Sequence, residues 1–357
     1  MYQKINDDDN NNNNLIFTTK KYDNIGCIIF DIDGVLIDVR KSYNEAIKNT
    51  VQFVVGSLIK KDNLKELVTD KVILKFRQTG GFNNDADTSY AISLALLSYP
   101  ELENSNFENF LIEVAEHGDE TGIYSIEKYI KKLLSNKIPS FSNNSIKIQE
   151  ILDYLNYPGK VGDSIISTVF DEFFYGQELF SKKHRIKPEY YFGKPLIEND
   201  RIVITDNTIR KIKERFNGKI AMVSGRSKIA AAYALDKKFY LLDEKDSSVF
   251  LEDEDRKYAK PNPYGLKKAI NKINMETDDD ILYCGDSIED LIMCRRAEEE
   301  LNQKNLSKTR RVNIIFCGIY GCSNNPNELI NNFIEKKADI IIKSVNNLPH
   351  ILNKVSI

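Results

Sequence analysis

Two aspartates, Asp31 and Asp33, directly follow the short apolar segment Gly26-Cys27-Ile28-Ile29-Phe30. An apolar, β-branched run that ends in acidic and glycine residues is typical of a buried strand leading into a loop. Ligand sites of open α/β sheets lie at the carboxyl ends of the strands. One aspartate there can attack as a nucleophile while the other transfers protons, and a hard cation can bind between carboxylates. An ordinary acidic turn after a strand would give the same pattern.

Polar residues end two further apolar runs. One run leads into Ser224-Gly225-Arg226, and another leads into Gly285-Asp286-Ser287-Ile288-Glu289-Asp290. Lys260 lies between them, after a charged, irregular stretch. Taken singly, the serine can cap a helix, the lysine can be a solvated charge, and the last aspartates can begin a helix. These separate explanations do not account for the order in which the elements occur.

In this order the elements resemble the signature of the haloacid dehalogenase superfamily: DxDGV, a strand ending in Ser, a Lys, and GDxxxD. The resemblance covers about residues 22–40 and 201–350, and it is weaker between them. It implies an α/β fold, with a Rossmann-like parallel-sheet core and an inserted domain.

The resemblance also implies a role for each polar residue. Asp31 would be the nucleophile that forms an aspartyl-phosphate, and Asp33 would protonate the leaving oxygen and then activate water. Ser224 and the amide of Gly225 would donate hydrogen bonds to the phosphate. Lys260 would offset the charge crowded between phosphate and carboxylates.

A Mg²⁺ site is implied by the same resemblance. Asp286 would bind the ion together with the Asp31 carboxylate and the Asp33 backbone carbonyl, and Asp290 would orient a metal-bound water. Arg226 is a further candidate for contact with the substrate.

The aspartate at position 33 narrows the range of reactions that the resemblance implies. Relatives that cleave carbon–halogen bonds lack an acidic residue there, and transport ATPases carry Thr. The expected activity is therefore that of a Mg²⁺-dependent phosphatase acting on a small phosphorylated metabolite, which the sequence does not identify. A phosphomutase on the same core and a catalytically silent binding protein are the alternatives.

Composition agrees with a cytoplasmic enzyme. A chain of 357 residues with 41% hydrophobic residues predicts two domains with real cores. The net charge of −3 indicates neither nucleic-acid nor membrane partners. No apolar run reaches the roughly 18 residues that a membrane span needs. The five cysteines form no CxxC pair and are expected to be reduced. The oligomeric state is not indicated.

The spacing of the motifs places an insertion after the first one. About 190 residues separate it from Ser224, far more than one helical crossover needs. Apolar spacing of three and four predicts helices within this gap, at residues 43–59, 64–79, 89–97, 107–116, 126–134 and 146–155. We therefore expect an α-helical cap at residues 41–200, as in the first subfamily of the superfamily. The catalytic core would comprise residues 22–40 and 201–357.

Outside the cap, the pattern predicts alternating strands and helices, which favours a parallel sheet with helices on both faces. Helices are predicted at residues 206–216, 288–301 and 347–355, and strands at 312–318 and 338–342. Residues 1–21, which contain the Asp/Asn tract from Asp7 to Asn14, are expected to be disordered. The stretch 135–144 and the charged run 243–257 are expected to be solvated loops.

One cap segment, Thr79-Gly80-Gly81-Phe82-Asn83-Asn84-Asp85-Ala86-Asp87-Thr88, is similar to a glycine-rich, Asn/Asp-bearing segment in a small group of uncharacterised phosphatases of the first subfamily. Asn83, Asn84 and Asp85 could therefore read the substrate. Alternatively, the segment is a helix–helix loop in which Asp85 or Asp87 caps the next helix.

Overall fold

The computed structural model describes residues 3–6, 15–18, 24–59, 63–82, 84–99, 104–137, 148–273, 279–304 and 311–353. The chain divides into two compact units. Residues 1–39 and 200–357 form the first, which we call the core unit, and residues 40–199 form the second, the helical unit.

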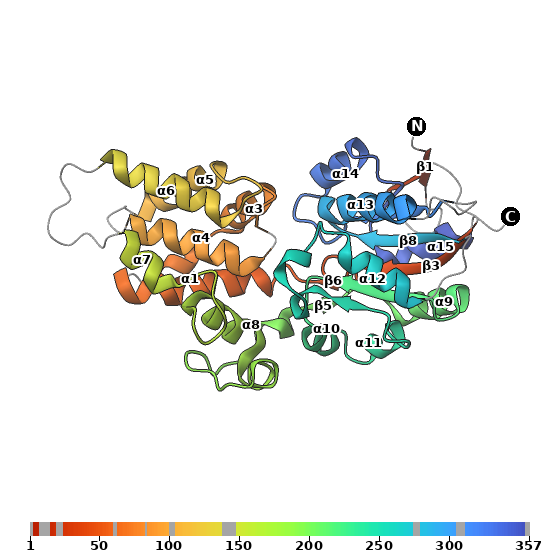
Figure 1. The fold of residues 1–357 in the computed structure, drawn as a ribbon, viewed down its shortest axis with the longest axis horizontal. Coiled ribbons are helices and arrows are strands. Elements are labelled where there is room, and N and C mark those ends of the chain that lie inside the picture. The colour runs from red at the N-terminus through yellow and green to blue at the C-terminus, as the bar shows by residue number, and fades with distance from the viewer. Residues whose placement is uncertain are drawn as a thin grey trace. The chain divides into compact units, whose positions relative to one another are not determined.

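The core unit is built on an eight-stranded sheet with the strand order β1-β2-β10-β9-β8-β3-β6-β7 (Figure 1). The six strands from β10 to β7 are all parallel, which confirms the predicted α/β fold with a parallel sheet. Their bounds are β3 Ile25–Phe30, β6 Ile220–Ser224, β7 Val249–Phe250, β8 Asp280–Gly285, β9 Ile314–Ile319 and β10 Ile340–Ile342.

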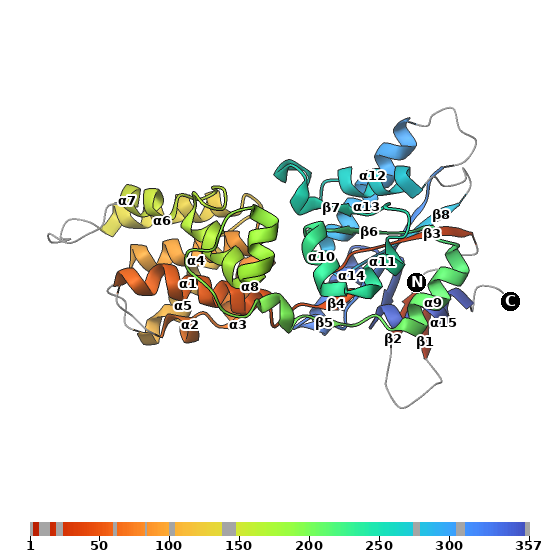
Figure 2. The ribbon, with the colours of Figure 1, turned by 90° about the horizontal axis from the view of Figure 1, so that it is seen from below.

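Helices cover both faces of this sheet (Figures 1 and 2). Side chains alternate along β3, so that Ile28 and Phe30 belong to one core cluster while Cys27 and Ile29 belong to the other. Because both faces are buried, the strands are almost continuously apolar. The first cluster includes residues of α9 Asp206–Phe216, α10 Lys228–Leu235, α11 Lys237–Leu242 and α15 Leu348–Asn353, and the second includes residues of α12 Tyr264–Ile273, α13 Ile288–Lys304 and α14 Pro326–Glu335.

The N-terminal segment extends the sheet, so the prediction of disorder over residues 1–21 is wrong in part. Strand β1 (Gln3–Asn6) pairs antiparallel with β2 (Leu15–Thr18), and β2 pairs antiparallel with β10. These strands cover backbone groups that β10 would otherwise expose at the sheet edge. The Asp/Asn tract at residues 7–14 lies outside the described residues.

The charged run 243–257 is not a plain surface loop. It contains β7 and two short turns of 3₁₀-helix, η2 (Leu251–Asp253) and η3 (Arg256–Tyr258). The carboxylates of Glu252 and Asp253 accept the backbone N–H groups of Ser227 and Lys228 at 2.8 and 2.7 Å. The two carboxylates therefore accept from N–H groups at the start of α10 that have no acceptor within the helix.

The helical unit contains all the cap helices that the sequence predicts, with changed bounds. Helix α1 matches its prediction, whereas the single helix predicted at 64–79 is split into two. The stretch 135–144 lies mostly outside the described residues. The helices are α1 Tyr43–Ile59, α2 Leu64–Leu67, α3 Asp70–Gln78, α4 Asp85–Ser98, α5 Asn104–Glu116, α6 Ile123–Lys137, α7 Ile148–Leu155 and α8 Ile165–His184, followed by η1 Leu196–Asn199.

The two chain segments that flank the helical unit pair with each other inside the core unit. Strand β4 (Ile37–Asp38) is antiparallel to β5 (Arg201–Ile202), and an ion pair of 3.2 Å joins the side chains of Asp38 and Arg201. The N–H of Val203 also donates to the carbonyl of Leu36 at 2.8 Å. This ribbon fixes the loop that carries Asp33.

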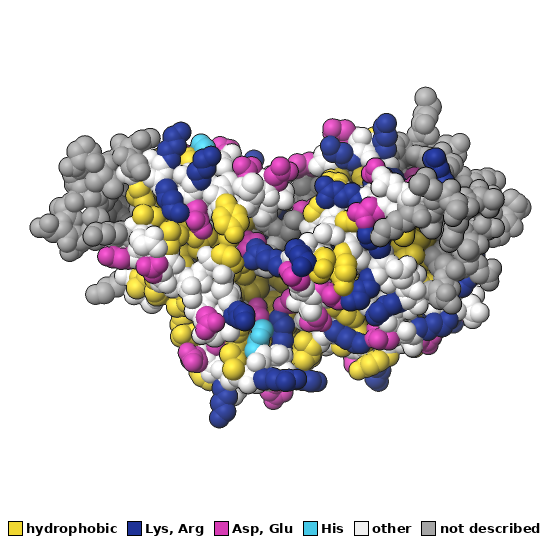
Figure 3. All heavy atoms as spheres, in the orientation of Figure 1, with side chains coloured by type: hydrophobic (Ala, Val, Ile, Leu, Met, Phe, Trp, Pro, Cys, Tyr) yellow, Lys and Arg dark blue, Asp and Glu magenta, His cyan; other side chains and the backbone are white. Residues whose placement is uncertain are grey.

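The surface drawn in Figure 3 shows acidic and basic side chains interspersed on both units, as the small net charge leads one to expect. Within the described ranges, no helix combines the length and the apolar character that crossing a bilayer requires. All five cysteines are free thiols, and four of them are buried.

Candidate active site

The polar residues singled out in the sequence follow three adjacent strands of the sheet. Asp31 comes directly after β3, Ser224 ends β6, and Asp286 comes directly after β8. The N–H of Asp31 donates to the carbonyl of Cys284 at 2.8 Å, which continues the β3–β8 pairing as far as this aspartate. Because the strands are parallel, their carboxyl ends meet at one edge.

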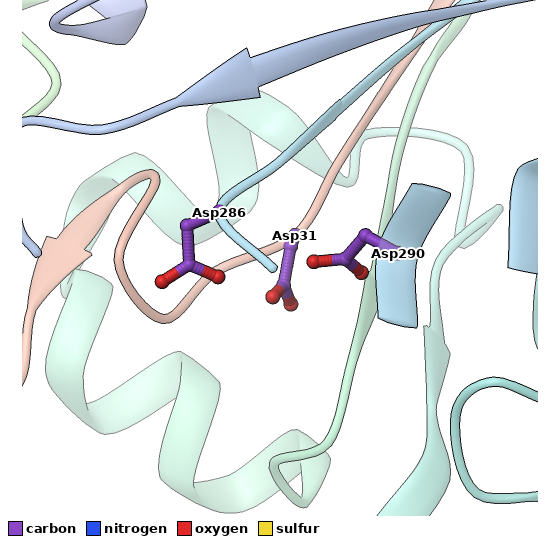
Figure 4. Close-up of side chains that lie close together, drawn as sticks. All are labelled: Asp31, Asp286 and Asp290. Carbon is purple, nitrogen blue, oxygen red and sulfur yellow. The ribbon is translucent and has the colours of Figure 1, made fainter. Parts of the chain in front are cut away.

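The structure brings Asp31, Asp286 and Asp290 into one acidic cluster. One carboxylate oxygen from each of the three residues lies within 4.8 Å of the other two. Figure 4 shows the Asp31 side chain between those of Asp286 and Asp290. Lys260 joins the cluster, with its Nζ 2.9 Å from Asp31 Oδ1 and 2.7 Å from Asp290 Oδ1.

The electrostatics of this cluster favour a cation. Burial raises the pKa of Asp31 to about 7, opposed by Lys260 and reinforced by Asp290 and Asp33. Burial, followed by the charges of Asp31 and Asp290, raises the pKa of Asp286 well above its usual range. Burial acts to lower the pKa of Lys260, but the two neighbouring carboxylates outweigh it and raise that pKa. Lys260 thus pairs with two of the three carboxylates, and a bound divalent cation would stabilise the ionised forms of all three.

Asp290 is held by more groups than the sequence indicated. The Tyr283 hydroxyl donates to Oδ1 at 2.9 Å, and the Ser287 hydroxyl donates to Oδ2 at 2.8 Å. Lys260 occupies Oδ1 as well. Sequence reasoning missed Tyr283 and Ser287, although a tyrosine inside a buried strand signals a hydroxyl that needs a partner.

Gly34 lets the first loop approach Asp286. Its φ is +72°, and a Cβ atom added there would lie 1.8 Å from Asp286 Oδ2. The turn is closed by hydrogen bonds from Gly34 N to Ile37 O and from Leu36 N to Ile32 O, both 2.8 Å long. Only glycine fits both the left-handed backbone and the carboxylate at this position.

Ser224 and Gly225 lie beside the same loop. The Ser224 hydroxyl is buried and accepts the Arg226 N–H at 3.2 Å, which uses a lone pair and leaves the hydroxyl hydrogen to be donated. Gly225 is exposed, and a Cβ atom added there would meet no atom within 4 Å. The space beside its backbone is therefore open to a ligand.

Arg226 does not suit the predicted role of substrate contact. Its side chain is buried, its Nε pairs with Asp33 Oδ1, and its Nη2 lies 2.7 Å from Asp200 Oδ2. The guanidinium is therefore engaged by carboxylates inside the core unit. Asp200 is a further residue that sequence reasoning missed, because its partner is 26 residues further along the chain.

The candidate substrate residues of the helical unit are engaged within that unit. Asn84 caps α4 by accepting the Ala86 N–H at 2.9 Å, so neither Asp85 nor Asp87 is the cap. Asp85 Oδ1 forms an ion pair of 2.6 Å with Arg77 Nη2. Asn83 lies outside the described residues. These contacts favour a structural role for Asn84 and Asp85, as parts of a helix–helix loop, over contact with the substrate.

Comparison with known proteins identifies the class. The family model of haloacid dehalogenase-like hydrolases matches residues 25–298, and the chain therefore belongs to this family. The protein is accordingly a hydrolase, built on the fold that its motifs indicate.

Two solved structures are similar over most of the chain. The phosphatase Tt82 from Thermococcus thioreducens has a TM-score of 0.52 and 20% sequence identity, covering 86% of this chain and 98% of its own. A target of the Northeast Structural Genomics Consortium has a TM-score of 0.59 and 15% identity, covering 93% and 99%. At these identities the similarity shows a shared fold. No curated protein sequence matches the chain.

Gly34→Ala is expected to lower both stability and hydrolytic activity. The left-handed backbone costs an alanine about 1–2 kcal/mol, and the added methyl group displaces the Asp286 carboxylate. Gly80→Ala is the matched control, since Gly80 has φ +82° but an added Cβ there meets nothing within 4 Å. Melting curves should show a loss in both variants, and only Gly34→Ala should lose activity. Equal activity in the two variants would contradict the tight fit at Asp286.

Asn84→Ala is expected to lower the free energy of unfolding by about 1 kcal/mol, the usual contribution of an N-cap. We expect kcat/KM to stay within about threefold of the wild-type value. Asn63→Ala serves as the control, because Asn63 precedes α2 without a side-chain capping bond. Denaturation and steady-state kinetics check both. A large fall in kcat/KM at unchanged stability would instead indicate that Asn84 contacts the substrate.

Proposed function

We propose that this hydrolase is a Mg²⁺-dependent phosphatase that acts on a small phosphorylated metabolite through an aspartyl-phosphate at Asp31. The observation that carries the proposal is the buried Asp31 carboxylate, paired with Lys260 beside Asp286 and Asp290, with Asp33 two residues further on. Family membership and the phosphatase named among the similar folds support it.

The contacts of Asp31 favour one of its oxygens as the nucleophile. Oδ1 accepts the Ile32 N–H at 2.8 Å and pairs with Lys260 at 2.9 Å. We therefore assign Oδ2 as the atom that attacks phosphorus. The new Oδ2–P bond forms as the bond from phosphorus to the ester oxygen breaks, and Asp33 gives its proton to that oxygen.

The second half of the reaction regenerates the enzyme. Asp33, now ionised, takes a proton from the attacking water, whose oxygen bonds to phosphorus while the Oδ2–P bond breaks. Asp31 is then a carboxylate again and phosphate is released. Ser224 and the amide of Gly225 are proposed to donate hydrogen bonds to the phosphate oxygens, and Lys260 to balance their charge.

The donor set suits Mg²⁺, which prefers a few carboxylate oxygens and keeps several waters. Asp31, Asp286 and the Asp33 backbone carbonyl would hold the ion. Asp290, with both oxygens already bonded, is better placed to orient a metal-bound water than to bind the ion directly. When bound, the cation would neutralise charge between phosphate and carboxylates.

The helical unit completes the proposal as a cap of the first-subfamily type, inserted between β4 and β5. A cap adds contacts to the organic part of a substrate and excludes water. Free thiols throughout the chain fit a reducing, cytoplasmic setting.

A phosphate-release screen tests this function. Purified protein is incubated with Mg²⁺ and a panel of sugar phosphates, nucleotides and small carboxylate-bearing phosphates, each in excess, beside the Asp31→Asn variant. We expect free phosphate from at least one class, and only with wild-type protein. Phosphate transfer within the substrate without release would indicate a phosphomutase, and no reaction with any ester would contradict the proposal.

A further inference from the structure

Arg226 is a fully buried cation between two carboxylates of the core unit. Its side chain has 0% exposure, and it contacts Asp33 through Nε and Asp200 through Nη2. Asp200 is equally buried, with 2% of its side chain exposed, whereas 28% of the Asp33 side chain is exposed. The pair with Asp200 is thus the enclosed end of the arrangement, and Asp33 is the end that reaches solvent.

A buried arrangement of charges is an inefficient way to stabilise a core compared with apolar packing. Removing charged groups from water carries a large free-energy cost, and apolar side chains of similar volume often stabilise a core equally well. What an arginine adds is direction, because its planar guanidinium holds a carboxylate in a defined orientation, whereas a lysine ammonium is a compact point charge.

The same ribbon carries both of the arginine's partners. Asp33 lies in the turn that leads into β4, and Asp200 directly precedes β5, the partner strand of β4. Arg226 comes from a third segment, two residues after β6. The arginine therefore connects the Asp33 side chain to the β4–β5 ribbon and to the strand that ends in Ser224.

We propose that Arg226, held by Asp200, is a positioning residue that fixes the Asp33 carboxyl group for proton transfer to the leaving oxygen. This inference rests on the phosphatase function proposed above. Because Arg226 pairs with Oδ1, Oδ2 of Asp33 is the oxygen that carries the proton. Its O–H bond breaks as the leaving oxygen gains the proton, and the same oxygen later takes a proton from water.

The leaving group of the substrate separates this role from a merely structural one. Phenol has a pKa of about 10, like the tyrosine side chain, so its anion is a poor leaving group. Cleavage of phenyl phosphate therefore depends on the proton that Asp33 donates. The more acidic p-nitrophenol leaves with little help. A misplaced Asp33 should therefore slow phenyl phosphate much more than p-nitrophenyl phosphate, whereas a damaged fold would slow both equally.

The experiment compares kcat and kcat/KM for both esters in wild type, Arg226→Lys, Arg226→Gln and Asp200→Asn, with folding checked by circular dichroism. Arg295→Lys is the matched control, because Arg295 pairs with Asp339 at 2.7 Å elsewhere in the core unit. We expect the preference for p-nitrophenyl phosphate to rise at least about tenfold in Arg226→Gln, mainly through kcat, and less in Arg226→Lys. The preference should stay unchanged in Arg295→Lys.

Two further variants make the result decisive. Asp33→Asn should show the same raised preference, and adding Arg226→Gln to it should raise the preference no further, since both act on one proton transfer. Should the Arg226 variants fail to fold, Asp200→Asn decides, with a rise in the same direction. An unchanged preference in the folded variants would overturn the inference alone. A folded wild-type protein that releases phosphate neither from these two esters nor from any ester of the metabolite panel would overturn the proposed function and the inference together.

Discussion

Asp31→Asn is expected to abolish phosphate release, lowering kcat by at least about 1,000-fold, or roughly 4 kcal/mol of transition-state stabilisation. An amide is a poor nucleophile, so the asparagine side chain is not expected to form the bond to phosphorus. The fold should survive, because Lys260 keeps its pair with Asp290 at 2.7 Å and the buried cluster loses a negative charge.

Phosphate release and melting curves check this expectation together. Asp279→Asn is the matched control, since Asp279 is a part-buried aspartate just before β8, at the opposite end of the strand from Asp286. The control should retain nearly wild-type turnover. Comparable rates in a folded Asp31→Asn variant would rule out Asp31 as the nucleophile.

Removal of divalent cations should also eliminate activity, and added Mg²⁺ should restore it. Three carboxylates within 4.8 Å repel one another, and Lys260 supplies a single positive charge. Without a cation the pKa of Asp31 is raised to about 7 and that of Asp286 is raised as well, so part of the cluster is protonated at neutral pH. A protonated Asp31 is a weak nucleophile.

Turnover is measured in excess chelator, with chelator presaturated by Mg²⁺ as the control. Asp286→Asn should raise the Mg²⁺ concentration needed for half-maximal activity by at least about tenfold, or 1.4 kcal/mol. Asp279→Asn should not change it. Full turnover in excess chelator would exclude a metal requirement.

The part of the site that the sequence predicted best is the part fixed by strand ends. Asp31, Ser224 and Asp286 each follow an apolar run, and in a parallel sheet the ends of such runs meet at one edge. Lys260 has no such local signal. Its position in the site was expected only from the resemblance, and the structure shows its contacts with Asp31 and Asp290.

Arg226 shows what a local pattern cannot supply. The serine- and glycine-rich sequence around Arg226 predicts an exposed side chain. Its burial depends instead on the carboxylates of Asp33 and Asp200. Such pairing over long sequence distances is set by the fold and leaves no periodic signal. The same holds for Glu252 and Asp253, whose charges cap α10.

Helix α8 was not predicted, although part of it carries a local signal. Gly176 interrupts it with φ +62°, and a Cβ atom there would lie 2.9 Å from Cβ of Pro195. Before the interruption, the apolar residues Ile166, Val169, Phe170, Phe173 and Phe174 follow the spacing of three and four that is typical of a helix, so this half could have been predicted from the sequence. In contrast, the unbroken helix α1 was predicted with its observed bounds.

The central claim, a phosphoryl group bonded to Asp31, is tested most directly by trapping the intermediate. Protein turning over a good substrate with Mg²⁺ is quenched with borohydride, which reduces an acyl phosphate to an alcohol and releases phosphate. Peptide mass spectrometry should then find homoserine in place of Asp31, only when substrate and Mg²⁺ are both present. Turnover without modification of Asp31, or modification at another carboxylate, would contradict the mechanism.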